Sequence, residues 1–332
     1  MQVLRISKKH GPHLCEAEVP APRKGEVLVK VMFAGICGSD LRMIRGEMDF
    51  SDGIILGHEF SGRVAARGKN ATKFRVGQMV MADPTVTCGR CVFCASGKRN
   101  LCSNLDGVNG GELGVNMDGA FAEYVRIRES NIYPLPRAMR PDVAALAEPL
   151  ACVLNGFKRI HAKPRTKACV IGLGPTGMLW CELFRKGSVS ASGIEISEAR
   201  ARIARKLGFD GASRADSGTF DYVVDTTGSC MRMACDMARP GGKVVLFGMN
   251  PSASETIVPF AIAKKDLDIH GVNMDAMTFT EALAMLKQIR SRSLITNILE
   301  LSEYEKAFRL AGLDLSSGKP SKPLAMKVLL CP

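Results

Sequence analysis

The sequence predicts an α/β protein with two domains, a β-rich one followed by one built on a doubly wound parallel sheet. From Thr166 onward, short apolar strands alternate with helix-compatible segments, which is typical of a parallel sheet with right-handed crossovers. The first 35 residues instead alternate polar and apolar side chains, which is typical of antiparallel strands. The length of 332 residues also exceeds that of most single domains.

The composition argues against several classes of function and partner. No run of about 18 apolar residues is present to span a bilayer and no signal peptide opens the chain, so we expect a cytoplasmic protein without a membrane partner. Twelve cysteines in such a chain favour metal ligands and reduced thiols over disulfides. The formal net charge of +12 would suit nucleic acid, but Lys and Arg are scattered among carboxylates. We therefore expect a small-molecule substrate and no nucleic acid.

The β-rich part opens with a clear strand pattern from Glu26 to Phe33. Cys37 follows in a Gly-Ile-Cys-Gly-Ser-Asp segment, His58 and Glu59 lie in Leu-Gly-His-Glu-Phe, and Glu148 lies in Ala-Glu-Pro-Leu. Each residue alone would be unremarkable, and only their combination suggests a common site.

Four cysteines give the least ambiguous signal. Cys88, Cys91, Cys94 and Cys102 are separated by two, two and seven residues. Four thiolates at this spacing can close a tetrahedral shell around Zn²⁺ with no open position, which predicts a structural zinc. Because the surrounding loop has little core of its own, the metal would supply its folding free energy.

Strand and turn patterns return over residues 107–136. Asp142 can then cap a helix that runs through Glu148 toward Arg159, although Pro149 must kink or interrupt it.

A glycine-rich turn organises the second half. Gly172, Gly174 and Gly177 follow a short apolar strand and open a helix, which suits a dinucleotide whose phosphates lie at the helix N-terminus. Glu195 follows Gly172 by 23 residues, where a carboxylate accepts hydrogen bonds from ribose hydroxyls and repels a 2′-phosphate. The sequence therefore predicts NAD rather than NADP.

The other expected elements follow the same periodicities. Strands are predicted at 168–172, 191–195, 221–225, 243–247 and 267–272, and helices at 176–187, 198–207 and 229–238. Two amphipathic helices, Thr278–Ile289 and Ser302–Ala311, precede a polar loop at Ser316–Pro323 and a last strand at Ala325–Leu330, which would return to the first domain.

With these motifs the chain resembles the zinc-containing medium-chain alcohol dehydrogenases, and within them the polyol, sorbitol, threonine and aminocyclitol dehydrogenases. The resemblance implies a GroES-like catalytic domain at 1–150 and 275–332, with a structural zinc lobe at 86–104, and a Rossmann NAD-binding domain at 151–274. It also implies a homodimer or homotetramer joined through sheet edges, for which Lys243–Met249 and Leu267–Val272 are candidates.

The resemblance assigns roles residue by residue. It implies a catalytic zinc held by Cys37, His58 and Glu148, with Glu59 in reserve, and so two zinc ions per chain. Ser39 would receive the alcohol proton and Asp40 would orient the ligand histidine. The cofactor positions are Gly172, Gly174, Pro175, Thr176 and Gly177 for the phosphates, Glu195 for the ribose, and Arg200 near the adenosine.

Two departures from the family stand out. Many relatives carry a relay histidine at the position of Arg42, whereas arginine stays protonated and cannot act as a base. Arg42 and Arg45 either receive an anionic group of the substrate or lie on a solvated helix surface. The segment between Phe209 and Phe220 is also too short for the helix that relatives place there.

The function implied is that of a zinc-dependent oxidoreductase that transfers a hydride between NAD and a secondary alcohol, namely a polyol, sugar alcohol, aminocyclitol or amino alcohol. One alternative is an amino-alcohol dehydrogenase resembling L-threonine 3-dehydrogenase. An alternative from another class is a zinc-ribbon nucleic-acid-binding protein on a dehydrogenase-like fold.

Overall fold

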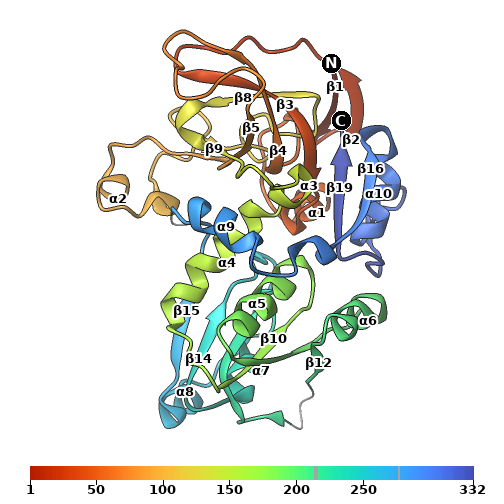
Figure 1. Ribbon diagram of the computed structural model, residues 1–332. Coiled ribbons are helices and arrows are strands. Elements are labelled where there is room, and N and C mark those ends of the chain that lie inside the picture. Colours follow the sequence, from red (N-terminus) through yellow and green to blue (C-terminus); the bar gives the residue numbers. More distant parts are fainter. Residues whose placement is uncertain (213–215, 276) are drawn as a thin grey trace.

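Two β-sheets, one in each half of the molecule, organise the computed structural model, which describes residues 1–212, 216–275 and 277–332 (Figure 1). The upper half in Figure 1 contains the N-terminal residues and the C-terminal strand, and the lower half contains the middle of the chain. The long helix α4 (Ala147–Ile160) leads from the first half into the second.

The lower half is a six-stranded sheet in which every neighbouring pair is parallel. Its order is β12-β11-β10-β13-β14-β15, the doubly wound arrangement that the sequence predicts. The strands are β10 (Lys167–Ile171), β11 (Ser190–Ile194), β12 (Asp210–Gly211), β13 (Phe220–Asp225), β14 (Ala238–Leu246) and β15 (Asp268–Gly271). The helices between them are α5 (Pro175–Lys186), α6 (Glu198–Lys206), α7 (Met231–Met237) and α8 (Pro259–Lys265).

The upper half is a seven-stranded, mostly antiparallel sheet that draws strands from both ends of the chain. Its strands are β3 (Glu26–Gly35), β4 (Glu59–Arg67), β5 (Met79–Ala82), β8 (Tyr124–Arg128), β9 (Ile132–Pro134), β16 (Ile295–Glu300) and β19 (Lys327–Cys331). Strand β19 pairs antiparallel with β3, opposing Leu329 to Gly35. The predicted last strand therefore does return to the first half, as Figure 1 shows for β19 beside β3.

Shorter elements connect and cover these sheets. Three two-stranded sheets pair β1 (Gln2–Ser7) with β2 (Gly11–Glu16), β6 (Thr85–Val86) with β7 (Gly111–Glu112), and β17 (Leu313–Asp314) with β18 (Lys319–Pro320). The other helices of the described residues are α1 (Gly38–Ile44), α2 (Val92–Ala95), α3 (Pro141–Ala144), α9 (Phe279–Leu286), α10 (Tyr304–Ala311) and the 3₁₀ turns η1 (Arg99–Leu101), η2 (Glu129–Asn131), η4 (Ser291–Leu294) and η5 (Leu301–Glu303).

The helix predicted from Asp142 toward Arg159 is interrupted, but not at Pro149. The chain forms α3, breaks at residues 145–146 and resumes as α4. Arg140 caps α3 and Asp142 lies inside its first turn, where it pairs with the Arg140 guanidinium at 2.8 Å. Pro149 lies in the first turn of α4, where a missing N–H costs no helical hydrogen bond, so it causes no kink.

Several elements were not predicted from the sequence, among them strands β4, β5 and β16, helix α8, and the β17–β18 hairpin, which overlaps the predicted polar loop. Between Phe209 and Phe220 the described residues contain β12 and no α-helix, whereas residues 213–215 of that segment lie outside the described residues.

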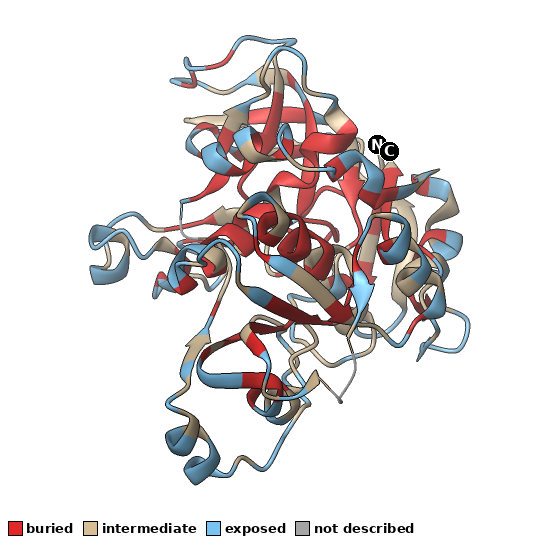
Figure 2. Cartoon of the chain, turned by 60° about the horizontal axis from the view of Figure 1, so that its bottom comes forward, coloured by how far each residue is buried: buried red, intermediate tan, exposed pale blue. Residues whose placement is uncertain are grey.

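The contact between helices α4 and α5 is densely packed. Trp180 and Phe184 of α5 are fully buried, and a Cβ at Gly156 of α4 would lie 2.7 Å from the Trp180 ring, so a glycine permits this close approach. Figure 2 shows buried residues along the sheets and central helices, with exposed residues toward the periphery. In the described part of the chain no helix is both long and apolar enough to cross a membrane.

Candidate functional site

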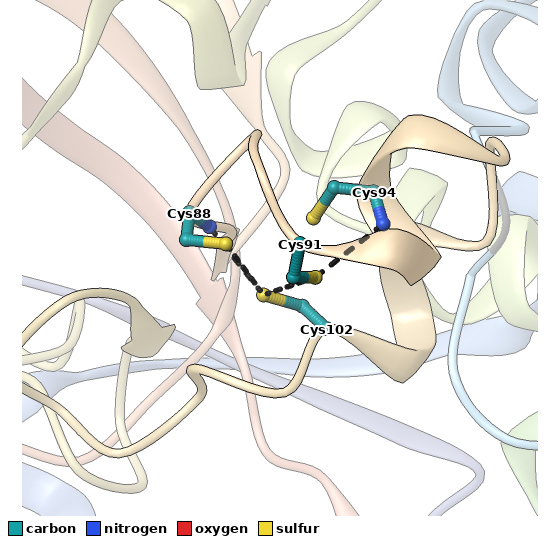
Figure 3. Close-up of side chains that lie close together, drawn as sticks. All are labelled: Cys88, Cys91, Cys94 and Cys102. Atoms are coloured by element: carbon teal, nitrogen blue, oxygen red, sulfur yellow. Dashed lines mark hydrogen bonds between the residues drawn. The ribbon is translucent and has the colours of Figure 1, made fainter.

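The four predicted lobe cysteines converge. The sulfur atoms of Cys88, Cys91, Cys94 and Cys102 all lie within 4.8 Å of one another (Figure 3). Cys102 Sγ lies 3.5 Å from Cys88 Sγ and 3.9 Å from Cys91 Sγ. Zn–S bonds of about 2.3 Å in a tetrahedron place sulfur atoms about 3.8 Å apart. The arrangement therefore fits a zinc ion.

The local surroundings change the pKa values of these thiols, and so the ease with which they bind a metal. Hydrogen bonds from the N–H groups of Cys94 and Ser103 lower the pKa of Cys91 to about 5, so its thiolate forms readily. Burial raises the pKa of Cys94 to about 11. A metal ion would have to displace the Cys94 proton, which couples zinc binding at this lobe to pH.

A second set of groups that could bind a metal, the metal-binding set, lies where β3, α1 and β4 meet. The ligand atoms of Cys37, His58 and Glu59 lie within 4.8 Å of one another, and His58 and Glu59 are buried. A thiolate, an imidazole and a carboxylate are ligands that zinc accepts, and three of them leave a fourth position for another group.

The surroundings orient the histidine of this set. Asp40 is fully buried and its Oδ2 accepts the Cys37 N–H at 2.8 Å, while its Oδ1 lies 3.9 Å from His58 Nδ1. Neither Asp40 Oδ1 nor His58 Nδ1 has a hydrogen-bond partner among the described residues. Nδ1 thus faces a carboxylate and Nε2 faces away from it, which is the orientation that a metal-ligating histidine needs.

Ser39 lies beside the same imidazole, with its Oγ 3.3 Å from His58 Nε2. Burial would lower the pKa of His58, but the Cys37 thiolate, together with Asp40 and Glu148, outweighs burial and raises that pKa well above its usual range. A divalent cation would take the place of that extra proton and satisfy the same negative charges.

The partner of Glu59 was not among the residues predicted for the site. Lys327 of β19 is almost fully buried and its Nζ forms an ion pair with Glu59 Oε2, and it also donates to the Ile36 carbonyl at 2.9 Å. A Cβ at Gly35 would lie 2.7 Å from Lys327 Cε, so only glycine leaves room for this pair. The one available signal was a lysine within the apolar strand Lys327–Cys331.

Glu148, the predicted third zinc ligand, lies near the set but outside the group within 4.8 Å. It lies in the first turn of α4 and its Oε1 accepts a hydrogen bond from Cys152 Sγ at 3.4 Å. Burial, opposed by His58 and reinforced by Glu59, raises the pKa of Glu148 to about 8. The carboxylate that the structure brings to Cys37 and His58 is therefore Glu59.

The glycine-rich turn has the predicted form. Strand β10 ends at Ile171, the next residue Gly172 has a φ of +87° that favours glycine, and α5 begins at Pro175. A Cβ at Gly177 would overlap the Gly172 carbonyl, so this residue must be small. Gly174 caps α5 without a side-chain hydrogen bond, so side chains leave the first N–H groups of the helix free for an anion.

Glu195 and Arg200 flank this turn. Glu195 accepts the N–H of Leu173 at 2.8 Å and that of Ser197 at 2.7 Å, which fixes its carboxylate at the end of β11. Arg200 Nε donates to the Ala325 carbonyl at 3.0 Å, and the guanidinium thus connects the two halves.

A cleft of about 500 Å³ between the two sheets brings these groups together. Its lining includes Cys37 and Glu59 from the metal-binding set, and Gly172 and Glu195 from the second half. The predicted Gly174, Pro175, Thr176, Gly177 and Arg200 line the same cleft. Arg42 also lies there, whereas Arg45 forms a two-contact ion pair with Glu47 at 2.6 and 2.7 Å.

Family comparisons agree with this geometry. The family "Alcohol dehydrogenase GroES-like domain" matches residues 23–137, and the family "Zinc-binding dehydrogenase" matches residues 175–288. D-altritol 5-dehydrogenase of Agrobacterium fabrum is 32% identical over 348 residues, covering 99% of this chain and 98% of the relative. Sorbitol dehydrogenase of Halalkalibacterium halodurans is 29% identical with 98% of each chain covered, and L-threonine 3-dehydrogenase of Bacillus subtilis is 30% identical with 90% and 92% covered.

Solved structures give the same result. A zinc-binding dehydrogenase candidate from Sinorhizobium meliloti with NADP bound has a TM-score of 0.89 at 26% identity and covers 100% of this chain and 99% of its own. An alcohol dehydrogenase from Escherichia coli with NADH bound has a TM-score of 0.87 at 27% identity, with the same coverage of both chains. The predicted fold class and the predicted resemblance are therefore confirmed.

Proposed function

This chain belongs to the zinc-binding alcohol dehydrogenase family, and from that premise we propose that it is an NAD-dependent dehydrogenase of secondary alcohols. Its substrate would be a polyol, sugar alcohol, aminocyclitol or amino alcohol, which it oxidises with NAD, or the matching ketone, which it reduces with NADH. One observation carries the proposal: a single cleft is lined by the metal-binding Cys37 and Glu59 and by the glycine turn at Gly172. Hydride transfer needs the alcohol carbon and the nicotinamide to meet, and this cleft provides that place.

We assign the catalytic zinc to Cys37, His58 and one carboxylate. The grouping within 4.8 Å supports Glu59 as that carboxylate. Glu148, which the sequence favours, remains the second candidate because it lies in the electrostatic surroundings of His58 and Glu59. Zinc content of the Glu59→Gln and Glu148→Gln variants separates the two, since only loss of a direct ligand should release the ion.

When bound, zinc supplies a Lewis acid that makes the alcohol hydroxyl more acidic, and the nicotinamide supplies the hydride acceptor. Ser39 Oγ lies 3.3 Å from His58 Nε2, the nitrogen that would be available to a metal, and its hydroxyl could accept the alcohol proton there. Arg42, at the position of the relay histidine in relatives, cannot take that proton onward, so it must leave Ser39 through water. Asp40 holds the Cys37 backbone and faces His58, and so keeps both ligands in place.

For the cofactor, we propose that Gly172, Gly174 and Gly177 accommodate the diphosphate at the start of α5. Pro175 and Thr176 form the first turn of that helix. Glu195 would accept ribose hydroxyls and disfavour a 2′-phosphate, which supports NAD over NADP.

We further propose that residues 1–150 and 275–332 form the catalytic domain and residues 151–274 the cofactor domain. Assembly as a homodimer or homotetramer would use the free edge of β15, the outermost strand of the six-stranded sheet. Val258 and Phe260, 56% and 71% exposed, lie just before that strand in the sequence and support an interface there. Light scattering tests this assembly, and a monomer would contradict it.

The decisive experiment measures NADH formation with polyols, aminocyclitols, phosphorylated sugar alcohols and L-threonine, with zinc content determined on the same sample. We expect two zinc ions per chain and turnover of unphosphorylated alcohols. The Cys37→Ser variant should lose one zinc ion and all turnover but keep NADH binding. Unchanged turnover in this variant would refute the site, and a preference for L-threonine would support the amino-alcohol alternative, which the Bacillus subtilis relative favours.

A further inference from the structure

Arg42 is a partly buried cation without an acidic partner. In the described residues it forms no ion pair, and its one hydrogen bond runs from Nη2 to the Thr227 carbonyl at 3.5 Å. Burial lowers the pKa of Arg42, so the protein itself does not stabilise this charge well. Arg45 on the following turn has both contacts to Glu47 and needs no further partner.

The side chain of Arg42 extends from one half of the molecule to a residue of the other half. Arg42 belongs to α1 beside the metal-binding set, whereas Thr227 follows β13 of the six-stranded sheet. The carbonyl that Arg42 contacts is held firmly, because the buried Asp225 accepts the N–H of Thr227 at 2.8 Å and that of Gly228 at 3.1 Å. The guanidinium is therefore directed to a fixed point on the opposite wall of the cleft.

That point adjoins the glycine turn. Strands β10 and β13 are parallel neighbours, with Ile171 opposite Asp225, so their carboxyl ends meet. Thr226 Oγ1 donates to the Gly172 carbonyl at 2.8 Å, and a Cβ at Gly172 would lie 2.9 Å from Thr227 Cγ2. Arg42 thus faces the place where a diphosphate would lie against the start of α5.

Among the described residues that line the cleft, the cations besides Arg42 are Arg200 and Lys327, and Lys327 is paired with Glu59. The glycine turn from Gly172 to Gly177 contains no charged side chain, and a diphosphate carries two negative charges in a cleft where water screens them poorly. Arg200 is already engaged with the carbonyls of Ala325 and Ala311.

We propose that Arg42 binds the diphosphate of the dinucleotide from the catalytic half, opposite the glycine turn. The inference rests on the proposed cofactor role of the cleft and adds a residue to it. It also gives a reason for an arginine at the relay position, because a guanidinium matches phosphate oxygens in charge and geometry. A phosphate on the substrate would be the other source of such an anion, but that interpretation needs Arg45 as well, and Glu47 occupies Arg45.

The test is a binding titration on the zinc-loaded chain without alcohol, so it does not depend on finding the substrate. NADH, ADP-ribose and adenosine serve as ligands, and Arg45→Met is the matched control on the same helix. Loss of charge-assisted hydrogen bonds should weaken NADH and ADP-ribose by about 10- to 100-fold in Arg42→Met. Adenosine, which lacks the diphosphate, should bind equally to all variants, and Arg42→Lys should retain part of the affinity.

Several results would overturn the inference. Unchanged NADH affinity in Arg42→Met would do so, as would an equal loss for adenosine, which would indicate general damage to the cleft. If NADH affinity persists while the KM of a phosphorylated sugar alcohol rises, the anion belongs to the substrate and the assignment is wrong. If Arg42→Met does not fold, the salt dependence of NADH binding by Arg42→Lys and the wild type decides, because equal affinities in both across ionic strengths would refute a specific guanidinium contact. A wild-type chain that bound no NADH would overturn the proposed function together with this inference.

Discussion

The buried ion pair between Lys327 and Glu59 should dominate the stability of the first sheet. The two side chains are 1% and 2% exposed, and Lys327 also satisfies the Ile36 carbonyl. Replacing Lys327 by Met keeps most of the volume but leaves an uncompensated carboxylate that is almost fully buried. Removing one partner of a buried pair typically costs about 3–5 kcal/mol. We therefore expect the Lys327→Met variant to lose about this much free energy of unfolding when the metal has been removed.

Two further variants make the prediction specific. Glu59→Gln combined with Lys327→Met removes both charges, so the double variant should be more stable than Lys327→Met alone. Lys322→Met, at an exposed position five residues earlier, is the matched control and should match the wild type. Urea denaturation followed by circular dichroism measures all four proteins. A Lys327→Met variant as stable as the wild type, or a double variant no better than the single one, would refute the reasoning.

Three other predictions concern the lobe, the cofactor and pH. Cys91→Ser should lower the zinc content by one ion and destabilise the lobe, while NADH binding persists. Elemental analysis and an NADH binding titration measure these effects. A variant with its full zinc content would contradict the four-sulfur site. Glu195→Ala should weaken the binding of NAD by about 10-fold and that of NADP by less. The ratio of the two dissociation constants measures this difference, and equal losses of affinity would argue against a contact of Glu195 with the ribose. Burial, opposed by the Thr85 N–H, raises the pKa of Asp83 to about 7. The folded state therefore holds the Asp83 proton more tightly than the unfolded state does, and the stability this gives is lost as pH rises from about 4 toward 7. Asp83→Asn should thus gain stability over the wild type in that range, and a difference that does not change with pH would contradict the burial argument.

The local motifs could be predicted because the residues that form each of them lie close together in the sequence. The glycine turn needs a positive φ at Gly172 and no side chain at Gly177, and both requirements appear as glycines at fixed spacing. The zinc lobe is likewise local, since Cys88 and Cys102 are 14 residues apart. These features follow from the sequence without knowledge of how distant segments pack.

Features that depend on distant segments were not predictable. Lys327 meets Glu59 across 268 residues, and Arg42 meets Thr227 across 185. Neither pair leaves a periodic pattern or a motif. The choice between Glu59 and Glu148 has the same origin, because both carboxylates lie next to ligand-like residues in the sequence and only packing decides which one approaches Cys37 and His58.

Because the chain is synthesised from its N-terminal side, Glu59 is made long before its partner Lys327. Glu59 leaves the ribosome 268 residues before Lys327 does, which at typical elongation rates is a delay on the order of 10–50 s. During that time the edge of β3 that β19 will cover is unpaired, and the Glu59 carboxylate has no cation from the protein. The first sheet to be made is therefore among the last to be completed, and the growing chain presents an open strand edge to other nascent chains or chaperones until its final strand arrives.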